Sequence, residues 1–387
     1  MKFATRLLHN GNEICPRTGA ASIPMYLAST YHQFDLDQPG RYDYARSGNP
    51  TREALEKTIA ALEGGSHGFA FSSGMSAVST VLLLFSNGDH LVASQDLYGG
   101  TYRVMAEVLP RLGITVDFVD TTDLNRVEAA IRPNTKGIYI ETPSNPTLKV
   151  TDIAGTAEIA RRHGALLIVD NTFLSPVYQN PLLLGADIVI HSATKFIGGH
   201  SDVVAGLVAV KDPTLAERIG FLQNAIGAVL GVQDAWLVLR GIKTLKTRMD
   251  TATRSAETIA QALANHPEVH RVYYTGLPSH PGHRLQCQQS SGHGAVLSFD
   301  VGSGERAREV LSRVRLPIVA VSLGAVESIL SYPAKMSHAA MPQHVRERHG
   351  ITDGLLRLSV GLEDVEDLLN DLEQALSVRS VSVASNR

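Results

Sequence analysis

Short apolar runs that alternate with amphipathic segments constrain the fold of this chain most strongly. Five runs have the length and composition of strands, and most of the segments between them follow a helical pattern. They are His90–Ser94, Ile114–Val119, Gly137–Glu141, Leu166–Asp170 and Asp187–His191. This alternation predicts an α/β fold with a mainly parallel sheet. Because ligands of open α/β sheets lie beyond the carboxyl ends of the strands, Glu141, Asp170 and His191 are expected near a site.

The strand pattern becomes sparser in the last third of the chain. Residues Val232 to Ala264 are predicted to form one long helix, followed by strand-like runs at Val269–Tyr273, Gly294–Asp300 and Leu355–Ser359. A length of 387 residues is too great for one simple core. We therefore predict an arm over residues 1–48, a large sheet domain over 49–245 and a smaller C-terminal α/β domain over 246–387.

Charge and cysteine content narrow the class of partner. The net charge of −3 offers no electrostatic footprint for nucleic acid or an anionic membrane, so a small molecule is the expected partner. The stretch Gly64 to Asn87 has the length of a membrane span, but repeated Ser and Gly favour a buried loop and helix. Cys15 and Cys287 are too few for a disulfide framework, which indicates a cytoplasmic protein.

Lys195 is the most informative single residue. It lies in the stretch His191–Asp202, between a strand-like run and a second apolar run, Val203–Val210. Burial there would lower the pKa of the lysine, which favours Schiff-base formation with an aldehyde. A solvent-exposed loop lysine is the alternative on this segment alone.

Asp170 supplies a second part of the same chemistry. It ends a strand-like run 25 positions before Lys195, so both side chains can meet at one sheet edge. A carboxylate there could keep a pyridinium nitrogen protonated, which makes pyridoxal phosphate (PLP) an electron sink. The alternative role for Asp170 is a helix N-cap.

A phosphate site is predicted at Phe71–Ala77, where small residues begin a helix and its backbone N–H groups favour an anion. Ser192 and Thr194 would add hydroxyl donors, and the cluster Tyr42–Arg46 offers a phenol and a guanidinium.

Two other motifs allow a different kind of site. Ala70–Gly74 also fits a nucleophile elbow in which Ser72 would be a hydrolase nucleophile, although this explains neither Lys195 nor Arg46. His280–His283 is predicted to form a turn rather than a metal site, because Pro and Gly separate the two histidines. No metal is expected.

Taken together, the motifs resemble those of the Cys/Met-metabolism PLP enzymes, in order from about Thr5 to Leu376. The motifs that carry the resemblance are Tyr44–Arg46 with Asn49–Thr51, Ser73–Met75, Asp96–Gly100, Glu141–Pro146, Val169–Thr172, Ser192–Lys195, Gly199–Asp202 and Arg357–Gly361. The resemblance implies a PLP-dependent transferase of fold type I, with residues 49–245 as its PLP-binding domain. It also implies a homotetramer, a dimer of dimers with shared active sites.

The resemblance assigns roles to the cofactor-site residues. Lys195 would form the Schiff base, Asp170 would face the pyridine nitrogen and Tyr98 would stack on the ring and act as a second catalytic group. The phosphate would be held by Gly74, Met75, Ser192 and Thr194, and by Tyr44 and Arg46 from the adjacent subunit.

The resemblance also implies a substrate and a reaction. Asn145, Ser322 and Arg357 would orient a sulfur amino acid, with Arg357 binding its α-carboxylate. Residues Glu327–Pro342 most resemble cystathionine β-lyases of Gram-positive bacteria, which implies a carbon–sulfur lyase that cleaves L-cystathionine by β-elimination to homocysteine, pyruvate and ammonia in methionine biosynthesis. Gly100 counts against methionine γ-lyase, whose members have Cys there.

Glu327 leaves the reaction open, because γ-lyases and γ-synthases share an acidic residue there. Glu327 is predicted to bind the distal ammonium of cystathionine; a solvated loop glutamate, or one paired with Lys335, is the alternative. Cystathionine γ-lyase, cystathionine γ-synthase or O-acetylhomoserine sulfhydrylase is the alternative activity. A non-catalytic PLP carrier would need neither Arg357 nor Tyr98.

Overall fold

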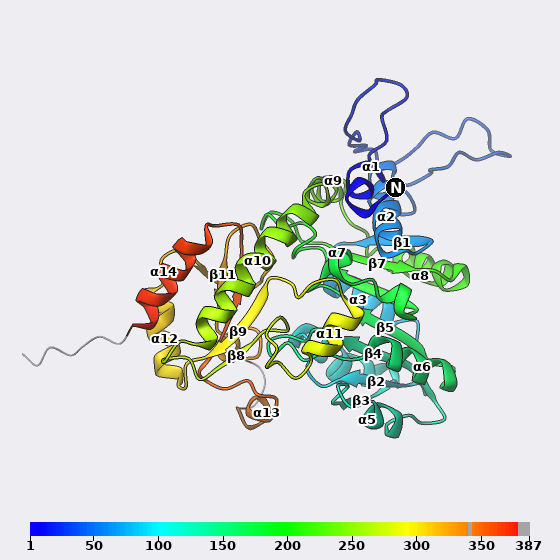
Figure 1. The fold of residues 1–387 in the computed structure, drawn as a ribbon. Helices are drawn as coiled ribbons and strands as arrows, with labels where there is room; N and C mark the ends of the chain where they lie inside the picture. Colours follow the sequence, from blue (N-terminus) through cyan, green and yellow to red (C-terminus); the bar gives the residue numbers. More distant parts are fainter. Residues whose placement is uncertain (340–342, 378–387) are drawn as a thin grey trace, which may run out of the picture.

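A computed structural model describes residues 1–339 and 343–377, which form two sheets with helices packed against them (Figure 1). The larger sheet has the strand order β1-β7-β6-β5-β4-β2-β3. Its strands are β1 (His67–Phe71), β2 (His90–Ser94), β3 (Thr115–Val119), β4 (Thr135–Glu141), β5 (Leu166–Asp170), β6 (Ile188–Ser192) and β7 (Gly206–Val210). Only β7 runs against its neighbours, so the predicted mainly parallel sheet is confirmed.

The smaller sheet lies in the C-terminal part, with the order β10-β11-β12-β9-β8. Its strands are β8 (Arg271–Tyr273), β9 (Val296–Asp300), β10 (Ile318–Val319), β11 (Ile329–Ser331) and β12 (Leu355–Ser359). Strands β8, β9 and β12 coincide with runs predicted from the sequence, whereas the short β10 and β11 have no such counterpart. The last ten residues of the predicted C-terminal domain, and Ala340–Pro342 of the Glu327–Pro342 run, lie outside the described residues.

Helices connect and cover the strands. Those of the first 230 residues are α1 (Phe3–His9), α2 (Pro50–Glu63), α3 (Gly74–Leu82), α4 (Gly99–Arg103), α5 (Leu124–Ala129), α6 (Ile153–His163), α7 (Ser175–Tyr178) and α8 (Pro213–Ile226). The remaining ones are α9 (Val232–Ile242), α10 (Leu245–Ala264), α11 (His283–Gln289), α12 (Gly304–Arg313), α13 (Gln343–Arg348) and α14 (Val365–Leu376). None of the helices in the described residues is long and apolar enough to cross a membrane.

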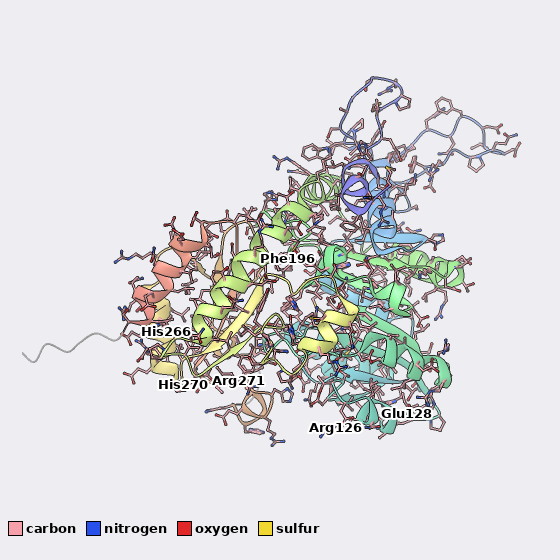
Figure 2. All side chains as sticks on the ribbon, in the orientation of Figure 1. Arg126, Glu128, Phe196, His266, His270 and Arg271 are labelled. Atoms are coloured by element: carbon pink, nitrogen blue, oxygen red, sulfur yellow. The ribbon has the colours of Figure 1, made fainter. Side chains whose placement is uncertain are left out.

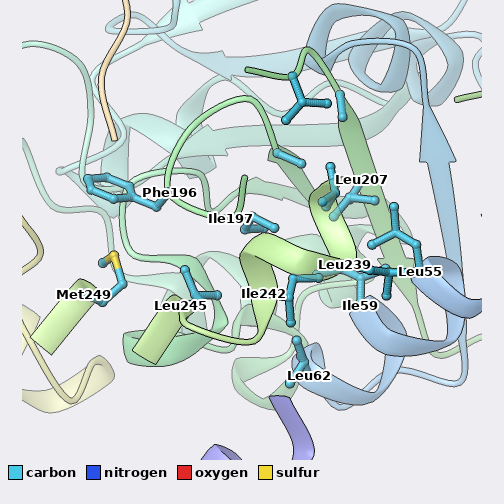
Figure 3. Packing of buried hydrophobic residues seen from close by; sticks show 14 of the residues in the cluster. Leu55, Ile59, Leu62, Phe196, Ile197, Leu207, Leu239, Ile242, Leu245 and Met249 are labelled. Carbon is cyan, nitrogen blue, oxygen red and sulfur yellow. The ribbon is translucent and has the colours of Figure 1, made fainter. Parts of the chain in front are cut away.

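Helix α2 begins where the sequence predicts. The Asn49 side chain accepts hydrogen bonds from the backbone N–H groups of Thr51 and Arg52, and Pro50 occupies the first helical position. The apolar face of α2, with Leu55, Ile59 and Leu62, is buried against α9 (Figure 3). This packing ties α2 to the helix that precedes α10.

The stretch Gly64 to Asn87 contains a strand where the sequence predicts a loop. This strand, β1, pairs with β7 and is followed two residues later by α3. Its sequence pattern is weak because it starts with His67 and Gly68, and only its last two residues are buried.

The predicted helix Val232–Ala264 is two helices. Helix α9 ends at Ile242 and α10 starts at Leu245, because the chain must turn where Gly241 approaches the loop after β6. A Cβ at Gly241 would lie 2.4 Å from the Gly198 carbonyl oxygen, so only glycine fits there. The Arg248 guanidinium donates to the carbonyls of Phe196 and Gly241 and joins this loop to both helices.

One hydrophobic cluster connects the loop after β6, which contains Lys195, to helices α9 and α10. Phe196, which lies at the centre of the molecule in Figure 2, packs in the same buried cluster as Leu245 and Met249 of α10 (Figure 3). Val296 of β9 belongs to this cluster too. The residue that follows Lys195 is therefore held between the large sheet and the C-terminal part.

Candidate active site

The carboxyl ends of six strands lie at one edge of the large sheet. Strands β2 to β6 are parallel to one another, and β1 has the same direction because β7 is antiparallel to both β1 and β6. Phe71 and Ser192 both pair with Gly206, so the ends of β1 and β6 lie on either side of the same residue. The topology thus places the loop before α3 beside the loop that carries Lys195.

A cavity of about 480 Å³ lies at this edge, a size typical of small-molecule sites. Ten predicted site residues line it: Gly74, Met75, Tyr98, Asn145, Asp170, Ser192, Thr194, Lys195, Ser322 and Arg357. Residues from both sheets contribute, so the site is built between them. Tyr44, Arg46 and Glu327 do not line the cavity of the single chain.

Lys195 has the environment that the sequence predicts. Burial, together with the positive charge of Arg357, lowers the pKa of its amine to about 8. Its Nζ donates a 2.6 Å hydrogen bond to Ser322 Oγ. At neutral pH a useful fraction of the amine is therefore uncharged and nucleophilic. This environment does not match an exposed loop lysine.

Asp170 is held in place by Thr172. Its Oδ1 accepts hydrogen bonds from the Thr172 backbone N–H at 3.0 Å and from the Thr172 hydroxyl at 2.6 Å. Burial raises the pKa of Asp170, and burial together with the neighbouring Asp170 raises that of Glu141 well above its ordinary value. A cationic ring nitrogen next to Asp170 would stabilise the ionised form of its carboxyl group and so offset the cost of burying it beside Glu141.

The N-terminus of α3 forms a cradle next to Ser192. Ser73 caps the helix by accepting a hydrogen bond from the Ser76 backbone N–H, and the N–H groups of Gly74 and Met75 belong to the first turn. A Cβ at Gly74 would lie 2.9 Å from Ser192 Oγ, so only glycine permits this close approach. The cradle therefore combines backbone and hydroxyl donors, which suits a phosphate group.

Arg357 is fixed at the other side of the cavity. It lies on β12, is only 3% exposed, and donates to Asn145 Oδ1 at 2.7 Å and to the Ser322 carbonyl at 2.6 Å. Its Nε is buried without a hydrogen-bond partner. Burial lowers the pKa of Arg357 to about 10, so it stays cationic at neutral pH. A carboxylate ligand would supply the missing acceptor.

Ser322 has a strained backbone with φ of 84°, a conformation that a non-glycine residue rarely adopts. This conformation lets its hydroxyl accept from Lys195 while its carbonyl accepts from Arg357. Ser322 in this conformation is thus hydrogen-bonded to both charged groups of the site, Lys195 and Arg357.

Tyr98 is positioned by its backbone and by a neighbouring glycine. Its N–H donates to Glu141 Oε2 at 2.8 Å, and the same carboxyl group accepts from the Asn145 N–H at 3.1 Å. A Cβ at Gly100 would lie 2.6 Å from the Tyr98 ring and 2.8 Å from Met75 Sδ. The ring therefore depends on the absence of a side chain at position 100.

Tyr44 and Arg46 lie on the surface of the chain. The Arg46 guanidinium lies 5.6 Å from the centroid of the Tyr44 ring and donates to the Asn224 carbonyl at 2.7 Å. Arg52 donates to the carbonyls of Ala45 and Arg46, so the backbone of this segment is tied to α2. Neither residue lines the cavity of its own chain.

Glu327 is exposed on the loop before β11, whose backbone is held by the hydrogen bond from Val326 N–H to the Gly199 carbonyl. Among the described residues it forms no ion pair with Lys335. Its predicted contact with the distal ammonium of the substrate stays a prediction.

Glu141, which the sequence predicts near the site, lines the cavity next to Asp170. His191 does not line it; its Nε2 lies 2.6 Å from Glu63 Oε1. Other cavity residues were not predicted as site residues, among them Thr172 and Phe173 after β5, and Met336 and Ser337 from the C-terminal part. The other residues follow loops whose course the sequence pattern does not show.

The residues present fit pyridoxal phosphate. The cavity holds an amine of lowered pKa, a carboxyl for a ring nitrogen, a cradle for a phosphate and an arginine for a substrate carboxylate. Ser72 is exposed, does not line the cavity, and no histidine hydrogen-bonds to it among the described residues. The arrangement therefore does not support the nucleophile-elbow alternative.

The comparisons with known proteins point the same way. The model of the family described as Cys/Met metabolism PLP-dependent enzyme matches residues 4–377. The chain is 58% identical over 380 residues to a protein named cystathionine β-lyase MetC of Bacillus subtilis, covering 98% of this chain and 97% of that one. It is 55% identical to a cystathionine γ-lyase of the same organism, covering 97% of this chain and 99% of that one.

A solved structure of cystathionine γ-lyase from Lactobacillus plantarum, complexed with L-serine, superposes with a TM-score of 0.95 at 50% identity. The match covers 97% of this chain and 98% of that chain. The predicted α/β fold of the type I PLP enzymes is thereby confirmed.

Proposed function

The chain belongs to the Cys/Met metabolism PLP-dependent enzyme family, and we propose that it is a carbon–sulfur lyase that cleaves L-cystathionine by β-elimination. The reaction breaks the bond between sulfur and the β-carbon and, with one water, yields homocysteine, pyruvate and ammonia. The single observation that carries the proposal is that Ser322 accepts hydrogen bonds from both Lys195 and Arg357. These three residues line the same cavity as Asp170. The 58% identity to a named β-lyase over nearly the whole chain supports the choice of reaction.

Pyridoxal phosphate, when bound, supplies an electron sink for the electron pair left at the substrate α-carbon. Asp170, fixed by Thr172, would hold the ring nitrogen and keep it protonated. The N–H groups of Gly74 and Met75 and the hydroxyls of Ser192 and Thr194 would hold the phosphate. Tyr98 would contact the ring, with the absence of a side chain at Gly100 leaving room for the tyrosine.

Arg357 orients the substrate. Its guanidinium binds the α-carboxylate as a bidentate pair, which satisfies the Nε that otherwise lacks a partner. Asn145, held by Glu141, keeps the guanidinium in position. The α-carbon is thereby directed toward Lys195.

Lys195 and Tyr98 move the protons. Tyr98 takes a proton from the incoming substrate amine, which frees that amine as a nucleophile. Lys195, with its pKa lowered to about 8, takes the proton from the α-carbon as a general base. The protonated Lys195 then supplies a proton to the departing sulfur, and Ser322 Oγ keeps the side chain aligned.

Tyr44 and Arg46 are proposed to bind the cofactor phosphate of an adjacent subunit. Both side chains are exposed and neither lines the cavity of its own chain, which supports a role in a neighbouring subunit. The assignment goes with a proposed homotetramer, a dimer of dimers with shared active sites. The proposed location is the cytoplasm, since both Cys15 and Cys287 are free thiols.

Cystathionine γ-lyase is the second candidate activity, and the names of two similar proteins favour it. Two similar proteins, one from Bacillus subtilis and one from Lactobacillus plantarum, are named cystathionine γ-lyases. Cleavage at the γ-carbon would release 2-oxobutyrate and cysteine instead. Identification of the keto acid that purified holoenzyme forms from L-cystathionine decides between the two.

A further inference from the structure

Three potential metal ligands converge outside the cavity, near the start of the C-terminal sheet. His283 and Cys287 lie four residues apart on α11, and His293 lies on the loop that leads into β9. Cys287 Sγ is 3.8 Å from His283 Nε2 and 3.9 Å from His293 Nε2, and the three ligand atoms all lie within 4.8 Å of one another. None of the three residues lines the proposed catalytic cavity.

Thr275 orients both imidazoles. The Nδ1 of His283 donates to the Thr275 carbonyl at 2.8 Å, so its Nε2 presents a lone pair to Cys287. The Thr275 hydroxyl donates to the His293 carbonyl and accepts from His293 Nδ1, each at 3.3 Å, which points the second Nε2 lone pair the same way. Histidines that bind metals have this pattern, with the non-ligating N–H held by a backbone or hydroxyl oxygen.

Hydrogen bonding within the cluster cannot satisfy its three members. With both Nδ1 atoms protonated, the two Nε2 atoms are acceptors, and one thiol has a single proton to donate. A cation would accept lone pairs from all three atoms at once. The two rings are stacked, at an interplanar angle of 13° with centroids 5.4 Å apart, and both Nε2 atoms lie within 3.9 Å of Cys287 Sγ. Because a metal ion lies in the plane of each imidazole that binds it, binding requires one ring to rotate toward the other nitrogen.

We propose that His283, Cys287 and His293 form a binding site for Zn²⁺, with a water molecule as the fourth ligand. The bond lengths of tetrahedral zinc place nitrogen and sulfur ligands about 3.5 Å apart, so the two distances from Cys287 Sγ to the Nε2 atoms need to shrink by only a few tenths of an ångström. Two imidazoles and a thiolate are the ligand set that zinc prefers. Cys287 is exposed, which leaves the fourth position open to solvent.

The site would strengthen the contact between α11 and the part of the chain that carries the large sheet. Directly after α11, Ser290 Oγ donates to Gln179 Oε1 at 2.7 Å, and Gln289 at the end of α11 donates to the Thr151 carbonyl at 3.0 Å. Bound zinc would tie α11 to the loop that follows it, next to these contacts. Its role is therefore structural, and the catalytic residues are not part of it.

Zinc binding should be measured on chelator-treated holoenzyme by competition with a chromophoric chelator. The parent protein is expected to bind one equivalent of Zn²⁺. Cys287→Ser should weaken binding by about 100-fold or more, and Thr275→Val by about 10- to 100-fold because it frees one imidazole. Cys15→Ser, which alters the buried thiol outside the cluster, is the matched control and should bind like the parent.

Two further measurements test the zinc site in the parent protein, so that they do not depend on the folding of a variant. Co²⁺ bound to the parent should show a thiolate-to-cobalt charge-transfer band, and Zn²⁺ should protect Cys287 from alkylation by iodoacetamide. Equal zinc affinity in the parent and in a folded Cys287→Ser variant would overturn the site. So would unchanged alkylation of Cys287 at saturating Zn²⁺, which would leave this cysteine as an accessible thiol without a metal.

Discussion

The Nζ of Lys195 lies 2.6 Å from the Oγ of Ser322, a residue 127 positions further along the chain. The backbone carbonyl of Ser322 accepts a hydrogen bond from Arg357, so one residue fixes both the proposed base and the group that binds the substrate carboxylate. Lys195 lies on the loop after β6, and Ser322 and Arg357 come from the C-terminal part. The two parts of the chain therefore form one site only when they are packed together.

The pKa of Lys195 leads to a pH-dependent prediction. Below pH 8 the ammonium form dominates and cannot attack an aldehyde, so capture of PLP by the apoenzyme should accelerate about tenfold per pH unit up to pH 8 and then level off. Borohydride should trap the cofactor on the peptide that contains Lys195. Lys195→Ala should trap none and be inactive, whereas Lys136→Ala, which changes an exposed lysine, should behave like the parent.

Reduced cofactor found on another lysine would remove Lys195 from the central role. Labelling of Ser72 by an active-site fluorophosphonate would instead revive the hydrolase interpretation.

Gly100 provides a steric test of the Tyr98 position. Gly100→Ala places a Cβ where the Tyr98 ring and Met75 Sδ now lie, so the ring must move away from the cofactor. We expect a fall of about 10- to 100-fold in kcat/KM, which corresponds to about 1.4–2.8 kcal/mol. Gly231→Ala is the control, because its Cβ would meet nothing closer than 3.7 Å. Native kinetics in Gly100→Ala would show that the position of the Tyr98 ring is unimportant.

The fold was largely predictable because its strands are buried and nearly continuously apolar. Strands β2, β4, β5 and β6 stand out from their helical surroundings, and Asn49-Pro50 marks the start of α2 through capping chemistry. Strand β1 was missed because a histidine and a glycine begin it. The break between α9 and α10 depends on the close approach of Gly241 to Gly198, a tertiary contact with no local sequence signal.

The site was predictable to the extent that its residues end strands. Asp170 and the Lys195 loop follow adjacent strands, so their proximity follows from topology. The link from Lys195 to Ser322 is different, since it depends on a strained backbone at φ 84° and on the packing of two sheets. The cluster around Cys287 was likewise invisible, because Thr275 and His293 meet α11 only after β8 and β9 have paired.

Subunit mixing tests the role of Arg46. Arg46→Ala should weaken cofactor retention by about 1.5–3 kcal/mol, the contribution of a charged hydrogen bond. A mixture of Arg46→Ala and Lys195→Ala chains should regain up to about one quarter of the parent activity after random exchange, because half of the dimers then contain one complete site. A mixture of Lys195→Ala and Asp170→Asn chains cannot regain activity, since both changes fall in the same part of the site. Failure of the first mixture despite demonstrated exchange would place every cofactor contact within one chain.

Glu327 tests recognition of the distal end of the substrate. Cystathionine has a second ammonium group there, and a carboxylate facing it would favour that charge. Glu327→Ala should raise KM for cystathionine about tenfold while changing kcat little, because this contact exists in the ground and transition states alike. An analogue that lacks the distal amine should be unaffected, and Glu305→Ala, at an exposed glutamate of α12, should change neither substrate. Equal effects of Glu327→Ala on both substrates would remove Glu327 from the recognition site.

The keto acid released from L-cystathionine tests the proposed reaction most directly. Purified holoenzyme should be incubated with L-cystathionine and the products identified by mass spectrometry, with the Lys195→Ala protein as the blank. The account predicts pyruvate, homocysteine and ammonia in equal amounts, since the bond to the β-carbon breaks. Release of 2-oxobutyrate and cysteine in place of pyruvate and homocysteine would contradict β-elimination and assign the chain to γ-cleavage.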